Sequence, residues 1–308
     1  MKKYSFKKRW IQAIQIIAAF GVCIPFFCIP PAEAFIVHSH TEQGNISIRS
    51  ECRQYSQGEA LMLLLEAPPF NSAVVSWRGQ EHLFVSNERK GQFFAIVPLG
   101  LNMQPGGYDL TVSLTDTNHR LRHFPLKITL SKGAFPSTKL KVKKRFTAPS
   151  EKHLKRIKKE QALLQKIYAT YTPHWLGNGE CIAPLQQKMT DTFGEHRIFN
   201  DGFRSRHRGI DIRSPRGTSI RASNGGSVIL ARNLYFGGNT VIIDHGIGLF
   251  SIYCHLDKIT VTERASIKKG ATIGCVGATG RATGPHLHWG FRLRNRYVNP
   301  LSILHLPF

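Results

Sequence analysis

The stretch from His207 to His288 constrains this chain more than any other, because three short segments of it contribute four histidines and one aspartate, among apolar runs and glycine turns. These residues are His207, Asp211, His255, His286 and His288. Imidazole nitrogens and a carboxylate oxygen suit Zn²⁺, and catalytic zinc typically keeps three protein ligands and one open position. The stretch therefore predicts a zinc site with hydrolytic chemistry.

The spacing of two histidines indicates a strand. His286 and His288 are two residues apart, and such side chains point to the same face of a strand, roughly 6.5 to 7 Å apart. Both imidazoles then face one groove, while Leu287 and Trp289 fall on the opposite face. Spacing alone does not tell which of the two histidines is a metal ligand.

The first two residues of the set require a bend in the backbone. His207 and Asp211 would lie about 13 Å apart on a straight strand, too far to share a metal ion whose ligand bonds are about 2 Å long. Gly209 lies midway between them. A residue without a Cβ makes such a bend inexpensive.

Several motifs in this region, taken together, resemble the lysostaphin or LytM type of zinc endopeptidase, which cuts peptidoglycan peptides. Three of them are His207-x-x-x-Asp211, Tyr253-x-His255-Leu256 and Gly280-Arg-Ala-Thr-Gly-Pro-His-Leu-His-Trp289. The likeness covers about Phe193 to Leu304 and includes Phe193-Gly194, Gly237-Gly-Asn-Thr-Val241, Asp244-His245-Gly246 and Val298-Asn-Pro-Leu301. So long a series of motifs in one order is highly specific.

The resemblance implies a role for each residue of the set. His207, Asp211 and His288 are expected to bind zinc, with one ion per catalytic domain. His255 and His286 are expected to act on the attacking water and on the transition state. A lone histidine elsewhere, such as His245, is expected to be structural.

The resemblance also points to residues and functions outside the set. Asn200 and Arg204, just before the first ligand, are expected to line the substrate groove. The predicted function is hydrolysis of peptide bonds in peptidoglycan cross-links or stem peptides. Some related proteins have lost ligands, so the alternative is a non-catalytic wall-binding or amidase-activating protein on the same scaffold. This chain keeps every expected ligand, which favours the enzyme.

The first 34 residues predict export to the periplasm or cell envelope. A basic start is followed by an apolar run from Trp10 to Ile29, and Ala32 and Ala34 form an A-x-A cleavage pattern. The alternative is an uncleaved membrane anchor, since the apolar run is nearly long enough to cross a bilayer. Pro25 and the cleavage pattern favour a signal peptide over residues 1–34.

The charge of the chain indicates an anionic partner. Removal of residues 1–34 takes away five of the 42 basic residues and one of the 19 acidic residues, which leaves a formal charge of +19. Such a charge attracts anionic polymers. No nucleic-acid-binding motif is present and export argues against a genomic partner, so peptidoglycan is expected. The basic segment Lys139 to Glu160 is either a solvated face or a contact with an anionic envelope surface.

The remaining pattern predicts a mainly β protein. Residues 35–131 contain about seven short strands at spacings near ten residues, which predicts an immunoglobulin-like β-sandwich. Residues 132–174 predict a basic linker and a helix that Ser150 caps, with an apolar stripe suited to packing against a neighbour. Residues 175–308 predict an antiparallel β catalytic domain with a zinc groove. Cys254 and Cys275 there could form a disulfide or stay free thiols.

Overall fold

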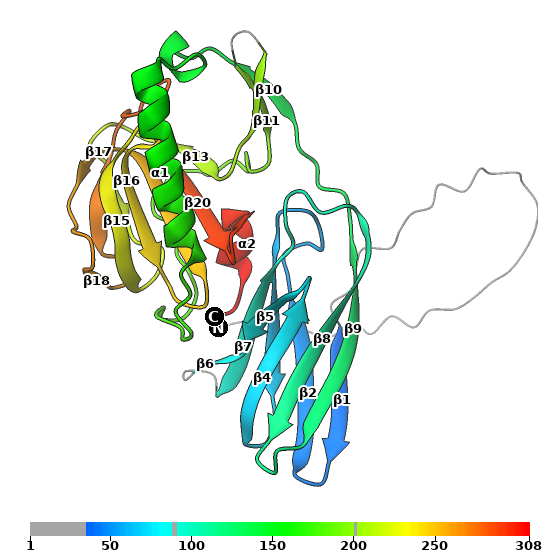
Figure 1. Cartoon of the computed structure of the whole chain (residues 1–308). Coiled ribbons are helices and arrows are strands. Elements are labelled where there is room, and N and C mark those ends of the chain that lie inside the picture. The colour runs from blue at the N-terminus through cyan, green and yellow to red at the C-terminus, as the bar shows by residue number, and fades with distance from the viewer. Residues whose placement is uncertain (1–34, 88–90, 200–201) are drawn as a thin grey trace, which may run out of the picture. The chain divides into compact units, whose positions relative to one another are not determined.

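The computed structural model describes residues 35–87, 91–199 and 202–308. The chain is mainly β, with antiparallel pairing throughout its largest sheet, as the sequence predicts (Figure 1). The predicted signal peptide, residues 1–34, lies outside the described residues. No helix within the described ranges is long and apolar enough to cross a membrane.

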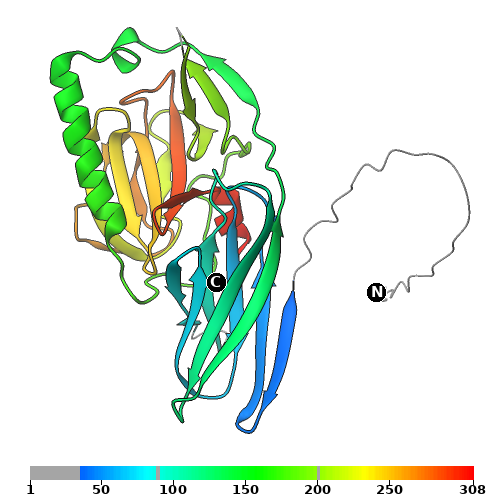
Figure 2. The ribbon, with the colours of Figure 1, turned by 45° about the vertical axis from the view of Figure 1, so that its right-hand side comes forward.

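Residues 36–130 form a sandwich of two antiparallel sheets (Figure 2). The first sheet has the order β1-β2-β3-β7-β6, with β1 (Ile36–Thr41), β2 (Gly44–Glu51), β3 (Ala60–Glu66), β6 (Val85–Asn87) and β7 (Gln92–Pro98). The second has the order β5-β4-β8-β9, with β4 (Phe70–Trp77), β5 (Gln80–Leu83), β8 (Gly106–Asp116) and β9 (Leu121–Leu130). Apolar side chains from both sheets form one buried cluster. The likeness of this sandwich to immunoglobulin domains stays a prediction.

The sandwich has two features that the sequence pattern did not predict. β1 was missed because it lies at a sheet edge and none of its side chains is fully buried, so it lacks an apolar alternation. The second feature is the break at Phe84, where the chain leaves β5 in one sheet and enters β6 in the other.

Both faces of β3 are buried, which explains its continuous apolar run. The odd-numbered leucines from 61 to 65 point into the core of the sandwich. The even-numbered residues from 60 to 64 belong to a second cluster, which includes Trp175 and Phe308 from the C-terminal part. The sandwich and the C-terminal sheet therefore share apolar core.

The segment predicted as a linker contains ordered structure. β10 (Ser137–Leu140) pairs in parallel with β11 (His196–Phe199), and β11 pairs with β12 (Phe203–Arg206). A short 3₁₀ helix, η1 (Lys144–Phe146), follows β10. A parallel edge strand in a lysine-rich segment has no apolar alternation, so no periodicity marks it.

Helix α1 (Glu151–Ala169) follows the predicted helix closely. Ser150 occupies the N-cap position, but its hydroxyl lies 3.1 Å from the His153 ring nitrogen and makes no capping bond to the backbone, contrary to the prediction. Tyr168 is buried against Phe250, with ring centroids 5.6 Å apart. The helix thus packs on the outer face of the C-terminal sheet, as its apolar stripe predicts (Figure 1).

The C-terminal sheet has nine strands with the main order β13-β20-β17-β16-β15-β18, and β14, β19 and β21 pair at its margins. Its elements are β13 (Ile210–Arg213), β14 (Ser219–Arg221), β15 (Gly226–Leu234), β16 (Gly238–Asp244), β17 (Leu249–Ile259), β18 (Ser266–Ile267), β19 (Thr272–Val276), β20 (His286–Leu293) and β21 (Arg296–Val298), followed by helix α2 (Pro300–His305). The antiparallel β structure predicted for residues 175–308 is thus present.

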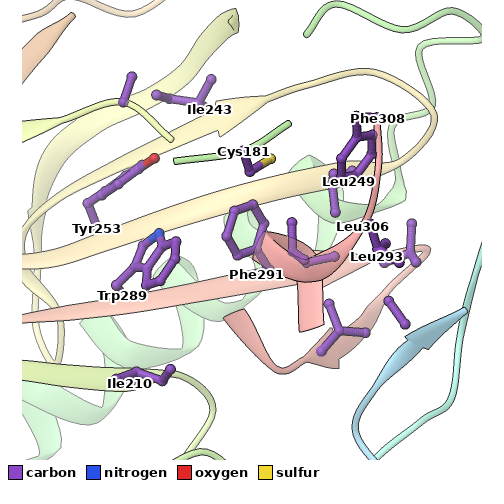
Figure 3. Close-up of a cluster of buried hydrophobic side chains, with 14 of the residues drawn as sticks. Cys181, Ile210, Ile243, Leu249, Tyr253, Trp289, Phe291, Leu293, Leu306 and Phe308 are labelled. Atoms are coloured by element: carbon purple, nitrogen blue, oxygen red, sulfur yellow. The ribbon is translucent and has the colours of Figure 1, made fainter. Parts of the chain in front are cut away.

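Strand β20 separates the core from the face that carries the site. Its odd-numbered residues, Leu287 to Leu293, are fully buried and pack with Tyr253 and Ile210 (Figure 3). Its even-numbered side chains therefore face the other way. The predicted alternation around His286 and His288 is confirmed.

All four cysteines of the described residues are free thiols. β17 and β19 are neighbours, but their register places Cys275 opposite Lys258 rather than opposite Cys254. Burial raises the pKa of the Cys254 and Cys181 thiols to about 12, so both behave as apolar core residues.

Candidate metal centre

Three of the predicted residues converge at one end of the C-terminal sheet. Asp211 on β13 lies directly opposite His288 on β20 in the antiparallel register, and His207 precedes β13. His207 Nε2 lies 3.0 Å from Asp211 Oδ1 and 3.0 Å from His288 Nδ1. His288 Nδ1 lies 2.8 Å from the same carboxylate oxygen. Two imidazole nitrogens and one carboxylate oxygen thus share one small space.

This donor set fits a zinc ion. Ligand atoms bonded to zinc at about 2.0 Å in a tetrahedral arrangement lie roughly 3.3 Å from one another, and the three atoms here are already 2.8 to 3.0 Å apart. Among the described residues, His207, Asp211 and His288 are the group of three or more potential ligands whose atoms lie close enough together to bind one metal ion. Three ligands leave a fourth position for substrate or water, as catalytic zinc requires.

Outer contacts set the orientation of His207. Its Nδ1 lies 2.8 Å from the carbonyl oxygen of Thr192, which can only accept a hydrogen bond. Arg197 Nη2, which can only donate, lies 3.0 Å from the same Nδ1 atom, so the two contacts favour opposite tautomers of the ring. In either tautomer Nε2 faces the cluster. Arg197 Nη2 donates to Asp211 Oδ2 at 2.7 Å, and its Nε donates to Glu195 at 3.0 Å. The carboxylate oxygen on the cluster side is left for a metal ion.

The charge states also suit metal binding. Burial alone would raise the pKa of Asp211, but hydrogen bonds from His207 and His288 outweigh it and hold the pKa well below its usual range. Burial lowers the pKa of His288, against the opposing effect of Asp211. An ionised carboxylate beside a neutral imidazole is the state in which both bind metal.

The two histidines predicted to act on water and substrate lie beside this cluster. The rings of His255 and His286 are 4.8 Å apart, and the His255 ring is 6.1 Å from that of His288. His286 Nε2 lies 3.9 Å from Asp211 Oδ1, beyond hydrogen-bond distance. The structure therefore brings all five predicted residues together. His286 lies farther out than His207, Asp211 and His288, whose ligand atoms are within 3.0 Å of one another.

A bulge in β17 places His255. Two residues, Cys254 and His255, stand between the paired positions Tyr253 and Leu256, where the partner strand has only Thr240. His255 has a left-handed backbone with φ of 67°. Such conformations are rare for residues other than glycine and often occur at functional sites.

Within the part of the chain that the structure describes, the Nε2 atoms of both outer histidines make no hydrogen bond. The Nδ1 atoms of His255 and His286 lie 2.8 Å from the carbonyl oxygens of Thr279 and Gly284, respectively, so each Nδ1 donates its proton there. Burial, together with the neighbouring His286 and His288, lowers the pKa of His255 to about 3, which keeps it neutral at pH 7. The arrangement can accept a proton at one imidazole and stabilise developing charge at the other.

The two predicted groove residues are not placed with the cluster. Asn200 lies outside the described residues. Arg204 is exposed and lines a large cavity whose lining includes none of the five site residues. Their substrate-binding role stays a prediction.

Arg197 and Glu195 are site residues that sequence reasoning missed. Arg197 contacts Asp211 only because β11 and β12 form a hairpin that returns the chain to His207. Its neighbours Phe193-Gly194 were recognised as a motif, but nothing in the spacing marks the arginine as a partner of a ligand ten or more residues away.

Comparisons with known proteins agree with this geometry. The model of the family described as Peptidase family M23 matches residues 205–300. The peptidoglycan DD-endopeptidase ShyA of Vibrio cholerae is 42% identical over 96 residues, which are 31% of this chain and 22% of that protein. The murein hydrolase activator NlpD of Escherichia coli is 35% identical over 122 residues, which are 39% of this chain and 30% of that protein. The chain thus spans less than a third of either relative.

One solved structure is similar over most of the chain. A crystal structure from Pseudomonas aeruginosa, described as a peptidase M23, is 27% identical and has a TM-score of 0.62. The similarity covers 82% of this chain and 96% of that one, so it includes strands of the sandwich as well as the sheet that bears the site.

Proposed function

Because this chain belongs to peptidase family M23 through residues 205–300, we propose that it is an exported zinc-dependent endopeptidase. Its substrate is peptidoglycan, in which it hydrolyses peptide bonds of cross-links or stem peptides during cell wall remodelling. The description of ShyA as a peptidoglycan DD-endopeptidase supports this substrate class.

The observation that carries the proposal is the convergence of His207, Asp211 and His288 within 3.0 Å of one another. These residues would hold one zinc ion. Bound there, zinc supplies a Lewis acid that polarises the scissile carbonyl group and makes water a stronger nucleophile. Arg197 holds the Asp211 carboxylate, and the Thr192 carbonyl group holds the His207 ring, so neither ligand has to reorganise.

His255 and His286 would handle protons and developing charge. Each has its Nδ1 bonded to a backbone carbonyl group, so each ring is fixed and its Nε2 is available to the substrate side. A neutral imidazole can take a proton from the attacking water and return it to the leaving amine. The other ring can donate to the oxyanion of the transition state once it is protonated.

The charge of the chain suits an exported protein that acts on an anionic polymer. The formal charge is +19 without residues 1–34, whose role as a signal peptide is part of this proposal. The exposed lysines of α1 add an electrostatic contact with an anionic envelope surface, which steers a cationic protein toward its substrate.

The rival function is that of a non-catalytic activator of other wall hydrolases. The similarity to NlpD, described as a murein hydrolase activator, is the observation that favours it. Such a protein has no need for zinc ligands, whereas all three are present here with their outer contacts intact.

Purified sacculi of known cross-linking provide the test. The wild-type protein should release peptide fragments that mass analysis assigns to one cleaved bond, and His288→Ala should release none while losing its zinc by metal analysis. An activator would release no fragments alone but would stimulate an added amidase. Intact sacculi after incubation with fully zinc-loaded wild type would therefore exclude the endopeptidase.

A second pair of variants separates chemistry from metal binding. His286→Ala and His255→Asn should keep one zinc per chain, because neither side chain is among the three closest ligand atoms, while cleavage falls roughly 10²-fold or more. Asparagine is chosen for position 255 because it tolerates the left-handed backbone there better than alanine. Loss of zinc from either variant would assign that histidine to the metal instead.

A further inference from the structure

A cavity of about 1190 Å³ lies apart from the metal centre. It is lined by loops of the sandwich, by α1, and by residues of β11, β12, β20 and β21. Six of its lining residues are arginines: Arg78, Arg204, Arg206, Arg208, Arg292 and Arg296. It exceeds the usual size of a pocket for one small molecule, which is about 300 to 1,000 Å³.

The charge in this cavity is of one sign. No aspartate or glutamate is among its lining residues, and none of the six arginines forms an ion pair with another residue that the structure describes. Clefts lined by one sign of charge concentrate counter-ions. A bound anion would relieve the repulsion among the guanidinium groups.

Several of these guanidinium groups are held in place before any ligand arrives. Arg292 lies 4.1 Å from the Tyr168 ring centroid and 4.6 Å from that of Tyr297, while Arg208 lies 5.0 Å from the Tyr297 ring centroid. Among the described residues, Arg292 Nε and Arg206 Nη1 are buried without a hydrogen-bond partner. Guanidinium groups fixed in this way suit carboxylate or phosphate oxygens.

The other polar lining residues favour a peptide over a phosphate polymer. Six side-chain amides line the cavity: Gln80, Asn102, Gln104, Gln161, Gln165 and Asn295. Their oxygen atoms are acceptors, which a peptide N–H group can use and a phosphodiester cannot. The rings of Trp77 and Tyr108 add apolar surface beside them.

We infer that this cavity is a second binding site, which takes a carboxylate-bearing peptide, and that its ligand is the acidic stem peptide of peptidoglycan. This inference rests on the proposed function. Arg206 and Arg208 flank His207 in the chain, and the Arg208 carbonyl oxygen lies over Gly290 between the site residues of β20 and Arg292. A stem peptide in the cavity would thus hold the polymer next to the segment that carries a metal ligand.

Binding of an uncross-linked disaccharide-tetrapeptide, released from sacculi by a muramidase, tests the inference. The full mature chain carries His286→Ala so that the probe is not cleaved. Adding Arg78→Gln and Arg296→Gln should weaken binding at least roughly tenfold, because hydrogen bonds to charged groups are lost on two sides of the cavity. The matched control is Lys127→Gln with Lys268→Gln, since both lysines are exposed, lie outside the lining and remove the same charge. Its binding should change less than about twofold, as expected for remote, screened charges.

Two further probes define the chemistry. The same tetrapeptide with its carboxylates amidated should bind as weakly to the wild-type cavity as the native tetrapeptide binds to the double arginine variant. Inorganic polyphosphate should compete poorly. Equal binding of the amidated probe, tighter binding of polyphosphate, or an equal loss in the lysine control would each overturn the inference. Sacculus cleavage by the wild type separates the two ideas: tetrapeptide binding without cleavage refutes only the proposed endopeptidase, and cleavage without tetrapeptide binding refutes only the second site.

Discussion

Gly209 shows how closely the backbone approaches the metal centre. The sequence predicts glycine there for an inexpensive bend, but the structure gives a more demanding reason. A Cβ at this position would lie 2.4 Å from the Trp289 carbonyl oxygen and 2.9 Å from the His288 ring. The obstacle is the backbone of β20, which cannot move aside as a flexible side chain can.

Gly209→Ala should therefore lower both stability and zinc affinity. The added methyl group displaces His288 or β20, and overpacking of this kind costs about 1 to 3 kcal/mol of the free energy of unfolding. Chemical denaturation and a zinc competition titration measure the two effects. Gly107→Ala is the matched control, because no atom lies within 4 Å of a Cβ built there. If the two variants had the same stability and zinc affinity, β20 would be able to accommodate the added methyl group without either loss.

The residues of the candidate metal centre could be picked out from the sequence because each motif is local. His207 and Asp211 lie within five residues, and His286 and His288 lie within three, so strand geometry and the resemblance fix them. Spacing left open which of the last two is a ligand, and the structure favours His288 through its distances. Arg197 could not be predicted, because its contact with Asp211 depends on how two strands pair.

Among the elements, α1 combines a packing face and a charged face. Tyr168 is buried against the sheet, whereas Leu154, near the start of the helix, keeps 43% of its surface exposed. Lys155, Lys158 and Lys159 are exposed. Lys155 forms an ion pair with Glu151, one turn earlier in the helix, at 3.4 Å. Such exposed ion pairs contribute little to stability. The lysine face is therefore free to meet an anionic surface.

Replacing these three lysines with glutamine should weaken binding to intact sacculi at low salt. Exposed charges act within a Debye length of about 8 Å at physiological salt, so the difference from wild type should fade as salt rises. Cleavage of a small soluble peptide should not change, because the lysines lie outside the metal centre. Sedimentation with sacculi across a salt series measures the binding. If the triple variant and the wild type sedimented equally with sacculi at low salt, the lysine face of α1 would be solvated and would not bind the polymer.

The turn between β16 and β17 depends on a buried neutral histidine. His245 is fully buried, with Nδ1 2.6 Å from the Gly225 carbonyl oxygen and Nε2 2.8 Å from the Ser251 hydroxyl group. Burial lowers its pKa to about 4, although the bond to Gly225 opposes the shift. Burial also lowers the pKa of His82 in the sandwich to about 4.

Stability should consequently fall as the pH is lowered from about 6.5 to 4. In this range the unfolded chain binds protons at histidines that the folded chain keeps neutral, so the free energy of unfolding rises with pH. One pKa unit corresponds to about 1.4 kcal/mol, so His245 should contribute about 3 kcal/mol to the difference. Denaturation at pH 7 and pH 4.5 should show a smaller difference for His245→Gln than for the wild type. An unchanged difference would assign the acid sensitivity to other groups.

Strand β10 marks the limit of sequence reasoning at the scale of elements. Amphipathic strands and α1 are visible as periodic patterns, and most were predicted within a few residues. β10 lies in a basic segment without periodicity, and only its pairing with β11 makes it a strand. β11 in turn carries Arg197, so an element that the sequence does not reveal supports a residue of the site.

For the whole molecule, the sequence showed a fully apolar β3 but not what covers each face. Phe94 on the neighbouring strand packs edge-on against Trp175 and Phe308, with ring centroids 5.7 Å apart in both pairs. Polar contacts join the same surfaces: the Ala60 amide donates to the Ser302 hydroxyl group at 2.8 Å. Phe94 and Phe308, like Ala60 and Ser302, are more than 200 residues apart in the chain, so no local pattern could identify them.

This shared core predicts that residues 35–308 unfold as one unit. Leu114 is 2% exposed and lies in the cluster inside the sandwich, which does not include the C-terminal strands. Leu114→Ala should cost about 2 to 5 kcal/mol, and the loss should be the same for the slowest-exchanging amides of β7 and of β20, because one opening exposes both. Hydrogen exchange of the two strands in wild type and variant measures it. If protection fell in β7 and stayed constant in β20, the sandwich would unfold by itself, and the contacts of Phe94 would be too weak to join the two parts into one cooperative structure.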